Sequence, residues 1–255
     1  MADAYIFYNP LAGGGQILED LDALQFVLDD ECVLCDMTKP ETYGEALFSM
    51  KPEDYLVLCG GDGTLNRFVN LTAGLDRRNE ILYFPAGEHN DFAADFGRRY
   101  GDNPFLVDRY IRSLPKLRTG EKETAFLTGV SFLPREKQPL SLSVTADGKQ
   151  LVFENVCFAA VLYGNHAFGG MRPIPERTRQ RQDVTLLLMK ECTRLHARQV
   201  LHRLQRGRTL PHARCIQTLS SRQLELGFNA QVQTCLDGEQ QLLQTCSISF
   251  GKDSS

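Results

Sequence analysis

The sequence lacks any apolar run approaching the roughly 20 residues that a helix needs to span a bilayer. Its first residues, Met1–Tyr8, carry an acid where a secretory signal peptide carries basic residues, and their apolar stretch is short. These absences exclude a helical membrane span and a typical export signal. We therefore expect a cytoplasmic protein.

The chain also lacks a surplus of basic residues. Its 28 Lys and Arg face 32 Asp and Glu, which gives a formal net charge of -4 and no reason to expect a nucleic-acid partner. The 255 residues are 42% hydrophobic and 24% charged, which is ordinary for a globular protein and excludes a disordered chain or a coiled coil. A chain of this length can bury a core without disulfides or a structural metal.

The eight cysteines lack the spacing of a zinc site. Cys32 and Cys35 are the one close pair, and no second Cys/His pair follows at a matching distance. If this segment is a strand, the odd spacing puts the two thiols on opposite faces. We expect the cysteines to be reduced and mostly buried.

The first 114 residues alternate short apolar runs with segments of helical periodicity. This order predicts a doubly wound, mostly parallel α/β sheet, whose ligands bind beyond the carboxyl ends of the strands. The predicted strands are Ala4–Tyr8, Cys32–Met37, Tyr55–Cys59 and Ile81–Phe84, and the predicted helices run from Ile17 to Leu28, Glu41 to Met50 and Thr64 to Ala73.

The remaining residues, 115–255, change to strand-like runs separated by turns such as Asp147-Gly and Asp237-Gly. This half predicts an antiparallel β-sandwich domain with one helix, whose apolar stripe is Ala197, Val200, Leu201 and Leu204. The predicted strands are Leu140–Thr145, Leu151–Tyr163, Val184–Met189, Gln223–Phe228, Gln231–Cys235 and Leu242–Phe250.

The segment Gly60–Asn66 combines a glycine-rich turn with the start of a helix. Such a turn presents bare backbone N–H groups and the positive end of a helix dipole, where a phosphate can bind. Asp62 adds a carboxylate able to hold Mg²⁺ and Thr64 adds a hydroxyl. The segment is not a Walker A loop, and Asn66 stands where a Rossmann fingerprint has its third glycine.

This loop, Gly60-Gly-Asp-Gly-Thr64, resembles the GGDGT loop of the diacylglycerol kinase catalytic-domain family, bacterial lipid kinases related to diacylglycerol and sphingoid-base kinases. Further motifs of that family have counterparts in the same order along the chain. These are Asn9-Pro10 with Gly13, Pro85–Ala93, Asn165–Pro173 and Asp237-Gly-Glu239.

The resemblance implies a nucleotide-binding domain (1–114) and a lipid-substrate domain (115–255), with the active cleft between them. It implies transfer of the γ-phosphate of ATP to the hydroxyl of diacylglycerol or a related lipid, with Mg²⁺ held by Asp62 and Asp91. Asp62 and Glu239 are then the catalytic residues, and Glu239 is the general base. The residues that it assigns to ATP are Asn9, Pro10, Gly13, Thr38, Gly60, Gly61, Asp62, Gly63, Thr64, Asn66, Glu88, Asn90 and Asp91.

Asn90 and Asp91 also have a structural interpretation, as the N-terminal cap of a helix that continues into Phe92. The residues alone do not decide between a capping role for Asp91 and a role in ordering the metal or the phosphate loop.

The chain departs from the family pattern in several places, and two of the departures concern charged groups of the site. Glu88 replaces a threonine, and a carboxylate about 4 Å from a phosphate charge costs roughly 1 kcal/mol in water and roughly 4 at an effective dielectric near 20. Thr178-Arg179-Gln180 stands where the family usually has Asp-Asp-Gly. The family's structural Mg²⁺ site is therefore expected to be absent, with the Arg179 charge in its place.

These departures keep two alternatives open: a catalytically impaired relative that binds nucleotide or lipid and has a regulatory role, and a soluble-metabolite kinase of the NAD kinase or phosphofructokinase type. A homodimer also stays open.

Basic residues gather between Arg172 and Arg214, where eleven Lys and Arg face three acids, a local balance of +8. Four of these positions, Arg194, Arg198, His202 and Arg206, form one helical stripe. The stripe is interpreted either as a solvated face or as a surface that docks on anionic lipid.

Overall fold

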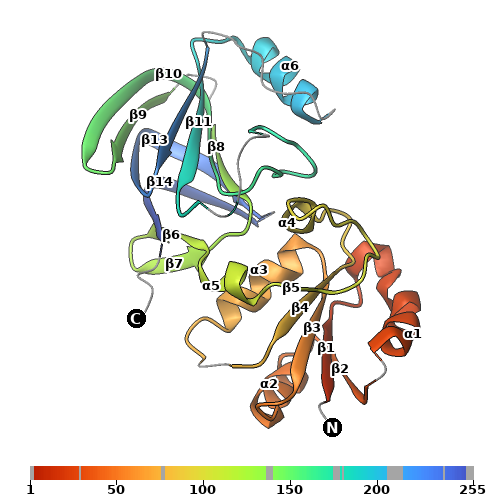
Figure 1. Ribbon diagram of the computed structural model, residues 1–255. Coiled ribbons are helices and arrows are strands. Elements are labelled where there is room, and N and C mark those ends of the chain that lie inside the picture. The colour runs from red at the N-terminus through yellow and green to blue at the C-terminus, as the bar shows by residue number, and fades with distance from the viewer. Residues whose placement is uncertain are drawn as a thin grey trace. The chain divides into compact units, whose positions relative to one another are not determined.

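The computed structural model describes residues 3–28, 30–75, 78–135, 140–174, 179, 181–205, 215–237 and 239–250, without the side chains of Thr42, Arg194, Ala197, Arg198, Leu201, Gln205 and Glu239. The chain forms two compact units, Met1–Arg112 and Ser113–Ser255. Both are drawn in Figure 1, and each is described by itself.

The N-terminal unit is an α/β sheet in the strand order β2-β1-β3-β4-β5. Its first four strands pair in parallel, and β5 is antiparallel to β4, which confirms the predicted mostly parallel sheet. The strands are β1 (Ala4–Tyr8), β2 (Cys32–Asp36), β3 (Tyr55–Gly60), β4 (Ile81–Pro85) and β5 (Phe105–Leu106). The helices are η1 (Ala12–Gly15), α1 (Ile17–Leu28), α2 (Pro40–Ser49), α3 (Asp62–Leu71), α4 (Asp91–Ala94) and α5 (Asp108–Arg112).

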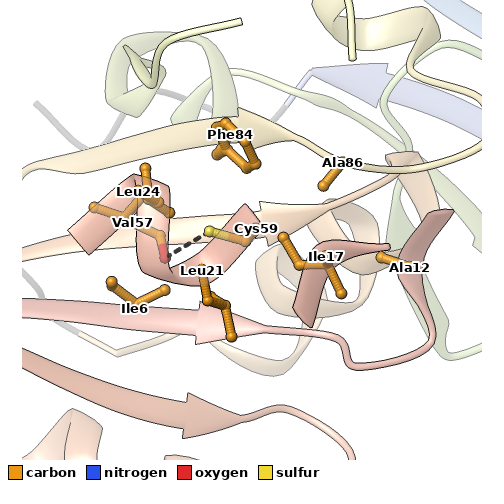
Figure 2. Close-up of a cluster of buried hydrophobic side chains, with 9 residues drawn as sticks. All are labelled: Ile6, Ala12, Ile17, Leu21, Leu24, Val57, Cys59, Phe84 and Ala86. Atoms are coloured by element: carbon orange, nitrogen blue, oxygen red, sulfur yellow. Dashed lines mark hydrogen bonds between the residues drawn. The ribbon is translucent and has the colours of Figure 1, made fainter. Parts of the chain in front are cut away.

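Successive side chains of β1 point to opposite faces of the sheet and pack against different helices. Ile6 joins a buried cluster with α1, shown in Figure 2, whereas the Phe7 ring lies 6.2 Å from the Phe68 ring of α3. The cluster in Figure 2 also contains Ala12 and Ala86, which belong to the segments that follow β1 and β4. The core therefore anchors two of the loops at the carboxyl end of the sheet.

The C-terminal unit is an antiparallel β domain, and its described strands form a nine-stranded sheet. β8, β9, β10 and β13 pair in a closed ring, because β9 and β8 each pair with both long strands β10 and β13. The strands are β6 (Pro115–Thr119), β7 (Lys122–Ala125), β8 (Gly129–Pro134), β9 (Leu140–Ala146), β10 (Lys149–Leu162), β11 (Val184–Lys190), β12 (Ile216–Ser221), β13 (Gln223–Leu236) and β14 (Glu239–Phe250).

This unit differs from the prediction in two ways: the strands β6, β7, β8 and β12 were not predicted, and one predicted break between strands is absent. The two predicted strands on either side of Asn229 are a single strand, β13, with a register shift between Gly227 and Val232. The first part of β13 pairs with β9 and the second part with β8. A bulge lets one strand bend between two partners, and the polar residues around Asn229 gave the appearance of a turn.

Helix α6 (Arg194–Gln205) packs its apolar side on the sheet. Val200 and Leu204 are buried against Phe158 and Met189, while the predicted partners Ala197 and Leu201 have no described side chains. No helix in the described part of the chain is both long and apolar enough to span a membrane.

All eight cysteines are free, as predicted. Cys35, Cys59 and Cys246 are buried, and the other five are only half-buried. The prediction that most are buried is therefore wrong. Cys32 lies in the edge strand β2, Cys192 and Cys215 lie beside β11 and β12, and Cys157 and Cys235 lie within the internal strands β10 and β13.

Candidate functional site

Three loops meet at the carboxyl edge of the parallel sheet, after the neighbouring strands β1, β3 and β4. The Asn9 amide donates to the Cys59 carbonyl at 3.3 Å, and the Ala86 amide donates to the Gly60 carbonyl at 2.9 Å. The buried Tyr83 hydroxyl donates to the same Gly60 oxygen at 2.9 Å. The loop after β3 is thus held between the other two.

Glycine is required where these loops cross. A β-carbon on Gly87 would lie 2.2 Å from the Cα of Gly61, and one on Gly60 would lie 2.5 Å from the Thr64 hydroxyl oxygen. Gly13 has a φ of +58°, and a β-carbon there would lie 3.0 Å from the Ala86 carbonyl oxygen. Gly13 and Gly61, which the family resemblance assigns to the nucleotide, therefore also bring the three backbones into contact.

Asp62 ties α3 to α4. Its carboxylate accepts hydrogen bonds from the Asp91 amide at 2.7 Å and the Phe92 amide at 3.1 Å, which are first-turn donors of α4. Asn90 occupies the cap position without a side-chain capping bond. Its side chain instead accepts from the Gly87 amide at 3.0 Å and donates to the Gly87 carbonyl at 2.7 Å. Asp62 therefore provides the cap that one of the two interpretations gave to Asn90 and Asp91.

The side chains of Asn9 and Thr64 connect the first loop to α3. The Asn9 side-chain amide donates to the Thr64 hydroxyl at 3.4 Å, and its carbonyl oxygen accepts from the Leu11 amide at 3.0 Å. Thr64 is 9% exposed, so its hydroxyl faces the loop rather than open solvent. These contacts place two of the predicted nucleotide-binding residues side by side.

Other predicted residues lie around this centre with different partners. The Thr38 amide and hydroxyl both donate to one oxygen of Asp36, at 2.8 and 2.7 Å. The side-chain oxygen of Asn66 accepts from Asn70 at 3.0 Å. Gly63 and Glu88 are exposed, and Pro10 is half-buried.

Tyr100 also belongs to this region and was not singled out from the sequence. Its ring lies 3.0 Å from the β-carbon position of Gly13, and its hydroxyl donates to Asp20 at 2.7 Å. Burial and the Asp20 carboxylate raise the pKa of Tyr100 to about 12, so the phenol remains protonated. No local pattern identifies such a residue, because its partner Asp20 is 80 positions away.

In the C-terminal unit, Asp237 begins the turn that leads to Glu239. Its φ is +42°, and its carboxylate accepts from the Leu127 amide at 2.8 Å and the Thr128 hydroxyl at 3.1 Å. Burial raises the pKa of Asp237, opposed by these hydrogen bonds and by the charge of Arg179. Glu239 is the first residue of β14. Gly238 and the Glu239 side chain lie outside the described part of the structure.

The chain is similar in sequence to known kinases. Residues 3–115 match the model of the diacylglycerol kinase catalytic domain. The N-terminal part of the chain is thus similar to this catalytic domain. The chain is also similar to a diacylglycerol kinase of Bacillus subtilis (strain 168). The alignment is 279 residues long with 24% identity, and it covers 94% of this chain and 90% of that protein.

Solved structures show the same diacylglycerol kinase fold. A crystal structure of a diacylglycerol kinase from Bacillus anthracis str. Sterne has a TM-score of 0.69 at 16% identity, and covers 97% of this chain and 93% of its own. An NAD kinase from Archaeoglobus fulgidus, solved in complex with ATP, has a TM-score of 0.54 at 14% identity, over 98% of this chain and 90% of its own. At these identities the likeness establishes the fold alone.

The metal that the diacylglycerol kinase family pattern implies has few side chains to hold it. Among the described residues, no group of three or more His, Cys, Asp or Glu side chains is arranged to hold a metal ion. Mg²⁺ that accompanies a nucleotide typically takes one or two carboxylates, together with phosphate oxygens and water. The half-exposed Asp62 fits this limited role, because it is a carboxylate that is partly open to solvent at the carboxyl edge of the sheet.

Proposed function

We propose that this chain is an ATP-dependent lipid kinase that transfers the γ-phosphate to the hydroxyl of diacylglycerol or a related lipid. The observation that carries the proposal is the Gly60–Asn66 loop, which lies within the matched residues 3–115 and packs against the loop after β4 at the carboxyl edge of the sheet. In open α/β sheets this edge is where ligands bind.

In this proposal, ATP lies over the three loops. The first-turn amides of α3 and the positive end of its dipole attract the phosphates, and the closely packed glycines let the phosphates approach the backbone. Asn9, Pro10 and Gly13 line the side of β1, Thr38 the side of β2, and Asn90 and Asp91 the side of β4. Phosphoryl transfer depends mainly on such positioning and on neutralising charge.

The proposed chemistry uses one general base. Glu239 takes the proton of the lipid hydroxyl, the lipid oxygen forms a bond to the γ-phosphorus, and the bond from that phosphorus to the β–γ bridging oxygen breaks to release ADP. Mg²⁺, when bound with ATP and held by Asp62 with Asp91 beside it, supplies charge neutralisation on the phosphates. Asp62 also keeps the Asp91 end of α4 in place.

We further propose that the lipid is presented at an anionic membrane surface on the cytoplasmic side. Helix α6 carries exposed His202 and Arg203 beside the basic positions Arg194 and Arg198. Arg206 of the predicted stripe lies outside the described residues. Basic groups near a membrane contribute about 1 kcal/mol each to binding.

A regulatory relative without activity is the second candidate. It is favoured by Glu88, an exposed acid in the loop after β4, and by the two α4 amides that occupy the Asp62 carboxylate. A hollow of about 480 Å³ in the N-terminal unit is also lined by residues other than the candidate set, namely Phe96, Gly97, Arg98, Gly101, Asp102 and Asn103. A kinase for a soluble metabolite is the third candidate, supported by the fold likeness to an NAD kinase.

One experiment separates these candidates. Transfer of radiolabelled phosphate from ATP is measured with diacylglycerols, sphingoid bases and NAD as acceptors, for the natural chain and for the Asp62→Asn and Glu239→Gln variants. Labelled lipid that both variants fail to produce supports the proposal. ATP binding in calorimetry without transfer to any acceptor supports the regulatory candidate, and labelled NAD supports the third.

A further inference from the structure

Arg179 is a buried arginine in the C-terminal unit. It is 8% exposed, and a guanidinium nitrogen donates to the Leu127 carbonyl oxygen. The guanidinium carbon lies 5.3 Å from the centre of the Tyr163 ring, whose hydroxyl donates to the Arg179 carbonyl at 3.4 Å. Since a buried charge is costly unless it is paired, this guanidinium calls for an acidic partner nearby.

Asp237 supplies the opposite charge, and it contacts Leu127, the residue that Arg179 also contacts. The Leu127 carbonyl oxygen accepts a hydrogen bond from the Arg179 guanidinium, and the Leu127 amide donates one to the Asp237 carboxylate. The groups that face Asp237 include the Leu127 amide, the Thr128 hydroxyl and amide, and the Arg179 charge. Leu127 thus bridges Arg179 and Asp237, and the Arg179 charge acts on Asp237 across it; we call these two residues the charge pair.

This pair lies at the start of a tight turn. Leu236 pairs with Glu239 across the β13–β14 hairpin, and Asp237 follows Leu236 directly. Asp237 has a φ of +42°, a left-handed conformation that Asp adopts in Asp-Gly hairpin turns, and its carboxylate holds this turn against Leu127 and Thr128. Whatever fixes the Asp237 carboxylate therefore also fixes the backbone from which Glu239 extends.

We propose that Arg179 is a positioning residue: its buried positive charge keeps ionised Asp237 bonded to Leu127 and Thr128, and thereby fixes the turn that carries Glu239. The catalytic part of this inference rests on the proposed function, in which Glu239 is the base. The structural part, a charge pair that holds a turn, does not require catalysis.

The first test is the pH dependence of stability in the full chain. Burial already raises the pKa of Asp237, and the Arg179→Met change removes a charge that opposes this rise. A raised folded-state pKa gives stability that is present at low pH and lost as the pH increases. The variant is therefore expected to lose little stability near pH 4 and progressively more up to pH 8 in urea denaturation. Each further unit of pKa lowers the folded-to-unfolded ratio about tenfold at high pH. A loss of stability equal at every pH would indicate packing alone and would overturn the proposal.

Two further variants make the result specific. Arg181→Met removes an exposed arginine two positions away and is expected to leave the pH profile unchanged. Asp237→Asn combined with Arg179→Met leaves no buried carboxylate to compensate, so the double variant is expected to regain stability at pH 8. If Arg179→Met alone does not fold, folding of the double variant supports the charge pair. Failure of the double variant to regain stability overturns it.

Phosphate transfer is the second readout. Arg179→Met is expected to lower the rate at saturating ATP at least about tenfold, while the ATP dissociation constant changes less than about twofold, because ATP is assigned to the N-terminal unit. An unchanged rate would overturn the positioning role and leave the proposed function intact. If the natural chain transfers no phosphate, the proposed function fails, and the stability profiles still decide whether the charge pair exists.

Discussion

The carboxylate of Asp62 accepts a 2.7 Å hydrogen bond from the backbone amide of Asp91. The two acids assigned to a metal are thus already joined through the backbone. We expect Asp62→Asn to destabilise the N-terminal unit, because the amide side chain has one acceptor oxygen in place of two, and its NH₂ group faces an α4 amide. Hydrogen bonds to charged groups contribute about 1.5–3 kcal/mol, so a loss of this order is expected in urea denaturation.

The control for this prediction is Asp22→Asn, which changes an exposed acid of α1 and is expected to leave stability within about 0.5 kcal/mol. Amide hydrogen exchange adds a local readout, with faster exchange at Asp91 and Phe92 in the Asp62 variant. Unchanged exchange at these amides would contradict the capping role.

The contact between Gly61 and Gly87 makes a second prediction. A methyl group at position 87 would lie 2.2 Å from one backbone atom of Gly61 and 2.8 Å from another, so the two loops have to separate. Overpacking of this kind typically costs 1–3 kcal/mol, and we expect Gly87→Ala to cost about 3 kcal/mol in urea denaturation. It should also weaken ATP binding measured by calorimetry.

Gly44→Ala provides the matched control. Gly44 lies within α2, and a β-carbon there meets no atom within 4 Å. Alanine is favoured over glycine in a helix by about 1 kcal/mol, so this variant is expected to be slightly more stable than the natural chain. If Gly87→Ala and Gly44→Ala changed the stability by the same amount, close packing would not be the reason for glycine at position 87.

The features that were predictable from the sequence are those encoded within a few residues. Alternation of apolar runs and helical periodicity in the first 114 residues gave the parallel sheet, and the Asp147-Gly turn forms the β9–β10 hairpin, with φ values of +46° and +82°. The glycine-rich segments at Gly13, Gly60 and Gly87 were also visible. The conformation of these segments follows from local backbone preferences.

The features that were not predictable depend on partners far apart in the chain. Asp62 caps a helix 29 positions away, and the Tyr100 hydroxyl bonds to an acid 80 positions away. Nothing next to Arg179 in the sequence indicates that its charge acts on Asp237. Periodicity and spacing describe one segment at a time. They therefore could not predict contacts between loops that follow different strands.

Asp54 makes a prediction about acid stability. It is 2% exposed and accepts from the Lys51 amide at 2.7 Å and the Asp3 amide at 3.1 Å. Burial alone would raise the pKa of Asp54, but these hydrogen bonds outweigh it, and the pKa is lowered. A lowered folded-state pKa gives stability that is present above the unfolded value of about 3.9 and is lost as the pH falls through the folded value.

We therefore expect Asp54→Asn to cost about 1–3 kcal/mol at pH 7, and the cost to shrink below about pH 4, in urea denaturation across this range. Glu53→Gln, at the exposed neighbouring position, should leave the acid profile unchanged. A cost for Asp54→Asn that stays constant from pH 7 to pH 3 would show that the charge of Asp54 is not involved.

The basic side of α6 is tested on vesicles. We expect sedimentation with vesicles that contain phosphatidylglycerol, and release as salt increases, because screening weakens attraction between exposed charges. Arg194→Gln with Arg198→Gln should weaken the binding roughly tenfold or more, at about 1 kcal/mol for each group. Lys122→Gln with Lys149→Gln removes two exposed lysines of other elements and is the control. Binding independent of anionic lipid and of salt would remove the proposed docking surface.

Glu88 provides the most direct test of where the phosphates lie. Its side chain is exposed, so the dielectric around it is close to that of water, and its repulsion of a phosphate about 4 Å away is about 1 kcal/mol. Glu88→Thr is therefore expected to tighten ATP binding about fivefold in calorimetry at low salt, with a smaller gain at high salt. Glu53→Thr removes an exposed acid from the turn before β3 and should leave the affinity unchanged. Equal affinities for the natural chain and Glu88→Thr at low salt would mean that the phosphates do not approach the loop after β4, and ATP would then have to be placed closer to β1.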